Sequence, residues 1–110
     1  MKAYTDLSQS KTLSKILPIE SADMGYLWTG TSYCDYPVSN QTIFKRVENM
    51  PCWSLAALLD ILHDYTLQTN SDGSVFVVCD SRKPMVSDSY KNPIDACYTM
   101  IVELKERNLI

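Results

Sequence analysis

The C-terminal part of this chain carries its strongest structural signal. Asn92 can accept hydrogen bonds from the free amides of a first helical turn, and Pro93 fits the first helical position, which needs no amide donor. Asp95 then places a negative charge at the positive end of the helix dipole. Apolar residues follow at steps of three and four: Ile94, Cys97, Tyr98, Ile101 and Leu104. This pattern predicts an amphipathic helix with one buried face.

Two more segments have helical patterns. Residues 53–63, entered through Pro51, have a stripe of leucines on one side and further apolar residues around most of the rest, which predicts a central, buried helix. Residues 7–17, which Pro18 closes, predict a short first helix. Residues 21–24 could form another turn before a long irregular loop over residues 26–40.

The strand signals are shorter. Residues 66–70 and 74–79 flank Asp72 and Gly73, a pair that favours the positive backbone angles of a tight turn, so they predict a β-hairpin. Val75 to Val78 are apolar without alternation, which suggests a strand that is covered on both faces. Residues 41–47 and 85–89 are weaker strand candidates. We therefore expect a single α+β domain over residues 1–110, with about three helices packed on a short two- or three-stranded antiparallel sheet.

Composition and charge exclude several classes of protein. The chain has 110 residues, of which 45% are hydrophobic, as in a globular domain. A net charge of −3 with no basic run longer than Arg82-Lys83 disfavours nucleic-acid binding, because phosphate neutralisation supplies most non-specific affinity. There is no apolar stretch of ~18 residues that could span a membrane. The polar N-terminus lacks the apolar core of a signal peptide, so we expect a cytoplasmic protein.

The four cysteines do not have the spacing of a metal site. Cys34, Cys52, Cys79 and Cys97 contain no Cys-x-x-Cys pair, whereas zinc sites usually draw two ligands from one tight turn. An even number is compatible with two disulfides, but the absence of a secretory signal favours reduced thiols. We expect neither a metal nor a cofactor.

Two blocks of sequence carry a resemblance. Pro51-Cys52-Trp53-Ser54-Leu55 and Asn92-Pro93-Ile94-Asp95-Ala96, with a weaker block at Ser21-Ala22-Asp23-Met24, resemble a family of small proteins encoded in gut bacterial genomes and phage-like mobile elements. The resemblance implies no activity, cofactor or catalytic residue, because the family has no assigned chemistry. Its members often carry alanine where this chain has Cys52, which argues against a catalytic role for that thiol.

Candidate catalytic residues are few. His63 lies close in sequence to Asp60 and Asp64, as a general base oriented by a carboxylate would require, but a cation in the last turn of a helix also simply complements the dipole. Cys52 precedes a predicted helix, whose amides could lower the pKa of its thiol. Eleven residues separate Cys52 from His63, or roughly 16 Å along a helix, which excludes a Cys–His pair within that helix.

An aromatic loop is the most function-like stretch. Tyrosine and tryptophan give large contact area at low entropy cost, and the interleaved Gly, Ser and Thr residues provide adaptable polar groups. The alternative is that these aromatics cover the core. We expect a contact surface, for a protein partner or a second copy of this chain, formed by Tyr26, Trp28, Tyr33 and Tyr36 with Trp53 and Ile61. The competing hypothesis is a small enzyme or ligand-binding protein that uses residues 26–36 with Cys52 or His63.

Overall fold

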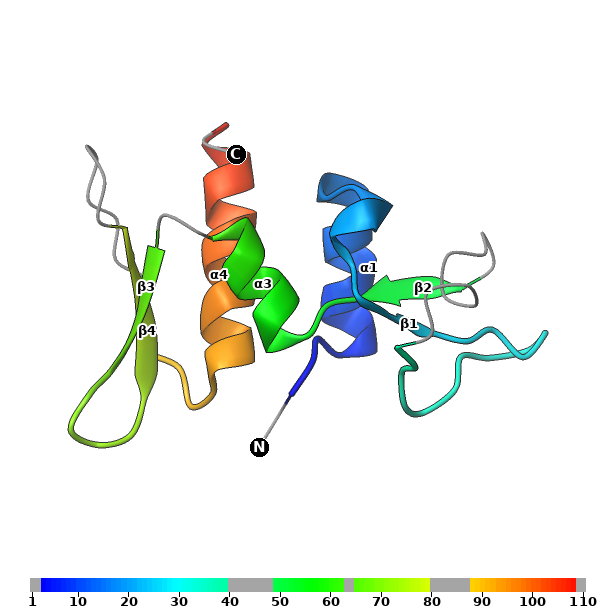
Figure 1. Ribbon diagram of the computed structural model, residues 1–110, viewed down its shortest axis with the longest axis horizontal. Coiled ribbons are helices and arrows are strands. Elements are labelled where there is room, and N and C mark those ends of the chain that lie inside the picture. The colour runs from blue at the N-terminus through cyan, green and yellow to red at the C-terminus, as the bar shows by residue number, and fades with distance from the viewer. Residues whose placement is uncertain (1–2, 40–48, 63–64, 80–87, 109–110) are drawn as a thin grey trace.

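The computed structural model describes residues 3–39, 49–62, 65–79 and 88–108, and they form helices and two small antiparallel sheets. In chain order the elements are α1 (Leu7–Ile16), the 3-10 turn η1 (Ile19–Ser21), β1 (Met24–Tyr26), β2 (Met50–Cys52), α3 (Leu55–Ile61), β3 (Tyr65–Thr69), β4 (Val75–Cys79) and α4 (Pro93–Glu106). Figure 1 shows α1 and α4 near the middle of the molecule, with the β3–β4 hairpin at one end and the β1–β2 sheet at the other. The α+β class is confirmed.

The C-terminal helix forms as predicted. Asn92 Oδ1 accepts a hydrogen bond from the Asp95 amide at 2.9 Å, and Asn92 Nδ2 donates to Asp95 Oδ2 at 2.8 Å, so the predicted cap is present. The helix then buries one face in the core, through Ile94, Ala96, Cys97, Met100, Ile101 and Leu104. Lys105 lies in the last turn, where its charge complements the helix dipole.

The first helix is also confirmed, and it begins with a capping box. The Asp6 carboxylate accepts from the Gln9 amide at 2.8 Å, while the Asp6 amide donates to Gln9 Oε1 at 3.1 Å. Gln9 Nε2 also donates to Asp95 Oδ1 at 2.7 Å, which joins the first turn of α1 to the first turn of α4. The two helices are therefore fixed side by side at their N-termini.

The helix predicted over residues 53–63 is shorter in the structure. It begins after Ser54, whose hydroxyl oxygen accepts from the Ala57 amide at 3.3 Å, and it ends at Ile61. Asp23 supports this cap, because its carboxylate accepts from both the Ser54 amide at 2.9 Å and the Ser54 hydroxyl. The prediction that Trp53 belongs to this helix is wrong, since serine is the better N-cap and the helix starts two residues later, at Leu55. Residue 63 lies outside the described residues.

The β3–β4 hairpin is confirmed, with Leu67 opposite Val77. Its turn is wider than a two-residue turn, because the Asn70 amide donates to the Ser74 carbonyl at 2.8 Å and only Gly73 has a positive φ, of 90°. Val75 and Val77 are buried in the core cluster that includes α4, whereas Phe76 and Val78 are half-buried. The two faces of this strand, both of which were expected to be covered, are therefore covered to different degrees.

The β1–β2 sheet was not predicted. Met24 pairs with Cys52 and Tyr26 pairs with Met50, across more than twenty residues of chain. Strands of three residues are too short to show a periodic pattern, and residues 21–24 instead suggested a turn, which the structure places at Ile19–Ser21. The strand candidate at residues 41–47 lies outside the described residues, as does most of the candidate at residues 85–89. No helix in the described part of the chain is long and apolar enough to cross a membrane.

Candidate contact surface

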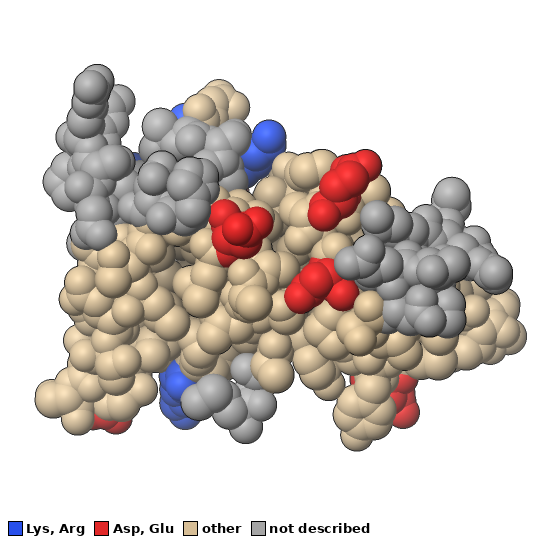
Figure 2. Space-filling view, in the orientation of Figure 1, with Lys and Arg blue, Asp and Glu red and all other residues tan. Residues whose placement is uncertain are grey.

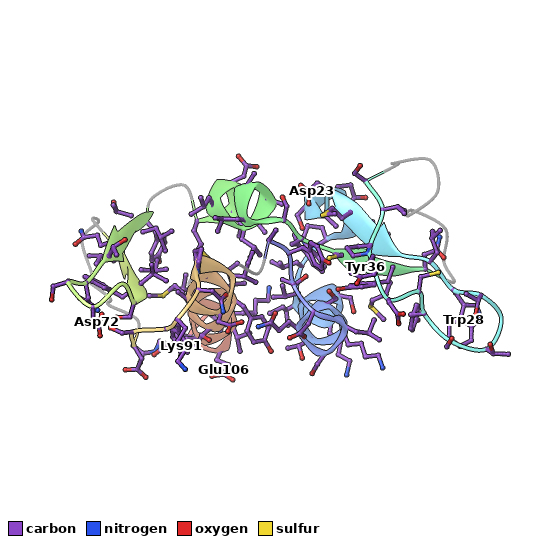
Figure 3. The ribbon with its side chains drawn as sticks, turned by 90° about the horizontal axis from the view of Figure 1, so that it is seen from below. Asp23, Trp28, Tyr36, Asp72, Lys91 and Glu106 are labelled. Atoms are coloured by element: carbon purple, nitrogen blue, oxygen red, sulfur yellow. The ribbon has the colours of Figure 1, made fainter. Side chains whose placement is uncertain are left out.

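Three aromatic residues of the loop are exposed or half-buried, and two of them, Trp28 and Tyr33, pack against each other. The exposed fraction is 39% for Trp28 and 75% for Tyr36, while Tyr33 is half-buried. Figure 3 shows Trp28 at one end of the longest axis of the molecule, with Tyr36 nearer the β1–β2 sheet. We call these three residues the aromatic tip.

The chain reaches this tip through a ribbon that extends from β1. Gly25 pairs with Pro51 of β2 on one side and with Val38 on the other, and the two backbone hydrogen bonds between Gly25 and Val38 measure 2.9 and 2.8 Å. Farther out, the Cys34 amide donates to the Leu27 carbonyl at 2.9 Å. The ribbon is thus a continuation of the small sheet, and the sheet determines the direction in which the tip projects.

The end of the ribbon is a closed polar turn. The Thr29 amide donates to the Ser32 carbonyl at 2.8 Å, and the Thr29 hydroxyl donates to the same carbonyl at 2.9 Å. Gly30 has a φ of 102°, a conformation that residues with side chains rarely adopt. These contacts order the turn without burying it.

Trp28 and Tyr33 lie opposite each other across the ribbon. Their ring centroids are 4.9 Å apart at an interplanar angle of 62°, an edge-to-face arrangement, and the Trp28 amide donates to Asn49 Oδ1 at 2.9 Å. Asn49 is itself buried and holds the edge of the ribbon from the chain just before β2. The two rings are therefore held in place although Trp28 is exposed, so little side-chain entropy remains to be lost on binding.

Tyr26 and Trp53 do not belong to this surface, and their prediction as contact residues is wrong. Tyr26 is 4% exposed and its hydroxyl donates to the Thr5 carbonyl at 2.9 Å, while Trp53 is fully buried and its indole donates to Ser21 Oγ at 3.0 Å. Both side chains fill the interior and satisfy their polar atoms there. Ile61 is half-buried and packs against the core, on a different part of the molecule from the tip.

Cys52 lies in a buried polar cluster around Thr5. Its thiol donates to the Thr5 carbonyl at 3.3 Å, and the Thr5 hydroxyl contacts Ser10 Oγ at 2.8 Å and accepts from the Trp53 amide at 3.1 Å. Burial raises the pKa of the Cys52 thiol, and this effect outweighs the hydrogen bonds from Thr5 and Ser10, which act in the opposite direction. Since Ser54 and Asp23 cap α3, Cys52 is not the residue at that helix entrance. The thiol is held as a neutral core group, the opposite of an activated nucleophile.

The other predicted candidates form no site among the residues that the structure describes. His63 lies outside the described residues, and Asp60 is exposed on α3. Cys34, Cys52 and Cys97 are free thiols. Within the described ranges, no three His, Cys, Asp or Glu side chains gather as a metal site would require.

The sequence did not reveal two residues that support the structure, one beside the ribbon and one in the core. Asn49 holds the Trp28 backbone from a distance of twenty-one residues along the chain, and Thr5 joins the N-terminal segment to β1 and β2. The sequence around neither residue predicts these contacts, because both residues form hydrogen bonds with partners that are distant in sequence. Comparison with protein-family models, with curated proteins and with solved structures finds no match to this chain.

Proposed function

We propose that this protein is a small, non-enzymatic interaction module of the cytoplasm, which contacts another protein through the aromatic tip. The observation that carries the proposal is the combination of exposure and order at Trp28. Trp28 is 39% exposed, its ring packs against Tyr33, and its backbone amide is bonded to Asn49. This combination suits contact with a partner better than packing in the core. Tryptophan and tyrosine are also the residues that most often dominate binding energy at interfaces.

The area of the tip favours a different protein over a second copy of this chain. With about 200 Å² for each aromatic side chain, the exposed parts of Trp28 and Tyr36 amount to roughly 230 Å². A stable interface needs about 800 Å² from each partner. The tip therefore fits a partner that receives it in a pocket, where a few aromatic anchors suffice, better than a flat symmetric dimer. From the family resemblance we also propose that the gene for this protein derives from a mobile element.

The alternative of a small enzyme or ligand-binding protein has less support. Cys52 is buried in the Thr5 cluster with its thiol neutral, and the fold places it on β2 at the inner end of the sheet and not on the outer ribbon. No observation on the described residues favours chemistry at the loop over contact through it.

Tyr36→Ala is the sharpest variant for a test. Its side chain is 75% exposed, so its removal should leave the fold unchanged while it removes contact area. Wild-type protein and the Tyr36→Ala and Trp28→Ala variants would be used as bait in extracts of the native host, and any retained protein would be purified and titrated by calorimetry. We expect at least a tenfold loss of affinity in both variants, since truncation of an aromatic residue that dominates an interface costs about 2 kcal/mol or more.

Ile19→Ala is the matched control, because Ile19 is 36% exposed but lies in η1, away from the ribbon. The control should bind as wild type does. A partner that binds all four proteins equally, or that is lost only with Ile19→Ala, would show that the aromatic tip is not the contact surface. Sedimentation of the purified wild type and of Trp28→Ala, each without a partner, tests for self-association. A wild-type dimer that dissociates in Trp28→Ala would show that the partner is a second copy of this chain.

A further inference from the structure

At the other end of the longest axis from Trp28, the turn of the β3–β4 hairpin exposes an aspartate followed by a glycine (Figure 3). Asp72 and Gly73 are both exposed, and the Cα of Gly73 faces open space, since a Cβ built there would meet no atom within 4 Å. An Asp-Gly bond is the aspartyl bond most prone to spontaneous rearrangement, because glycine offers no side chain to hinder its own backbone nitrogen.

The chemistry needs no reagent other than water. The Gly73 nitrogen attacks the carbon of the protonated Asp72 carboxyl group, a C–N bond forms, the bond from that carbon to the hydroxyl oxygen breaks, and the hydroxyl leaves with the amide proton as water. Water then opens the resulting succinimide ring at either carbonyl. One product is the original aspartate, and the other is isoaspartate, in which the backbone runs through the former side chain. The overall change is an isomerisation of equal mass.

Two hydrogen-bonded groups in the turn oppose this reaction. The Gly73 amide, which must become the nucleophile, donates to the Asn70 carbonyl at 3.0 Å. The Asp72 carboxylate, which must become a neutral electrophile, accepts through Oδ1 from the Ser74 amide at 3.0 Å and from the Ser74 hydroxyl at 2.6 Å. Hydrogen bonds to a carboxylate favour its charged form. The charged form is the unreactive one, because its carbon is a poor target for a nucleophile.

The Ser74 hydroxyl is held in position for this contact. Asn70 Nδ2 donates to Ser74 Oγ at 2.9 Å and to Ser89 Oγ at 2.8 Å, so the hydroxyl proton of Ser74 is directed toward Asp72. The same serine precedes Val75, the first residue of β4. The group that restrains Asp72 is thus anchored both to the strand and to the chain that enters α4.

We propose that Asp72–Gly73 is a site of spontaneous isoaspartate formation, which the Ser74 hydroxyl restrains. The rearranged bond adds one atom to the backbone at the turn, so it disrupts the two hydrogen bonds that close the hairpin, from the Gly73 amide to the Asn70 carbonyl and from the Asn70 amide to the Ser74 carbonyl. The product carries a free α-carboxylate, the group that carboxyl methyltransferases specific for isoaspartate recognise.

The test compares wild-type protein with Ser74→Ala and Ser74→Thr, aged at neutral pH and 37 °C in the folded state. Isoaspartate at position 72 would be quantified by peptide mapping with electron-transfer fragmentation, and independently by methyl transfer from S-adenosylmethionine with a purified isoaspartyl methyltransferase. We expect Ser74→Ala to isomerise faster by roughly threefold or more, because one of two donors to the carboxylate is lost. Ser74→Thr keeps the hydroxyl and should isomerise at close to the wild-type rate.

Asp72→Glu is the negative control, since glutamate would have to close a larger ring and should give no signal at this position. Equal rates in wild type and Ser74→Ala would overturn the role of Ser74. A loss of restraint in Ser74→Thr equal to that in Ser74→Ala would overturn it too, since a general disturbance of the turn would then explain both. A wild-type rate at Asp72 no higher than at the chain's other aspartates would overturn the site itself.

Discussion

Thr5 is a buried polar residue that four parts of the fold share. Its amide and hydroxyl bond the Trp53 backbone at 2.9 and 3.1 Å, its hydroxyl meets Ser10 of α1, and its carbonyl accepts from Tyr26 of β1 and Cys52 of β2. Every polar atom in this cluster therefore has a partner, as burial demands. A threonine in a polar N-terminal segment gives no sequence signal for this role, because its partners lie as far as 48 residues away.

Replacement of Thr5 by valine tests this cluster at nearly constant volume. The change removes the acceptor for the Trp53 amide and leaves that buried donor unpaired, so we expect the free energy of unfolding to fall by about 2 kcal/mol. Urea denaturation measures the change, and Thr5→Ser, which retains the hydroxyl, should lose less. A Thr5→Val protein as stable as wild type would mean that water satisfies the Trp53 amide.

The buried thiol of Cys97 should make the free energy of unfolding fall as the pH rises into the alkaline range. Burial raises the pKa of its thiol from 9.0 to about 11. The unfolded thiol ionises first, so the stability that burial of the neutral thiol supplies is complete below pH 9 and is lost as the pH rises toward 11. One such proton contributes a slope of about 1.4 kcal/mol per pH unit.

Urea denaturation across that pH window, on wild type and Cys97→Ala, checks the assignment. We expect the unfolding free energy of the variant to fall less steeply with pH. Cys52 and Tyr26, whose pKa values burial also raises, act with the same sign and remain in both proteins. Parallel curves would show that Cys97 is not the group responsible.

At the scale of elements, the helices followed from sequence and the shortest strands did not. Asn92, Pro93 and Asp95 act within one turn of α4, so local chemistry sufficed to place its start. The start of α3 was predicted two residues too early, because Asp23, which supports the Ser54 cap, lies 31 residues away in the sequence. β1 and β2 have three residues each and depend wholly on pairing with each other.

Asn92→Ala should remove the cap of α4. The Asp95 amide loses its acceptor, and we expect a loss of about 1 kcal/mol, which corresponds to a fall in melting temperature of roughly 4 to 8 °C. Asn92→Ser keeps an acceptor oxygen and should stay closer to wild type. Calorimetry would contradict the assignment if the alanine and serine variants melted together at the wild-type temperature.

At the scale of the whole molecule, the chain is a flattened body of 44 × 31 × 19 Å with a small sheet at each end. Figure 2 shows several separate acidic side chains across the face seen there, without a basic patch on its centre, which agrees with the net charge of −3. Sequence composition identified the aromatic loop, in which Trp28 and Tyr36 are exposed and Tyr33 is half-buried. The exposure of each aromatic could not be predicted, because it depends on tertiary contacts. Tyr26 is buried with its hydroxyl bonded to Thr5, whereas Trp28 lies on the outer ribbon against Tyr33.

The exposure of the aromatic tip can be measured through the two tryptophans, since Trp28 is 39% exposed and Trp53 is fully buried. Acrylamide quenching of tryptophan fluorescence would be followed in wild type, Trp28→Phe and Trp53→Phe, each checked for folding by circular dichroism. We predict that Trp28→Phe leaves blue-shifted emission that resists quenching, whereas Trp53→Phe leaves red-shifted emission that is strongly quenched. Emission from Trp28 that is as protected as that from Trp53 would contradict an exposed tip, and with it the proposed contact surface.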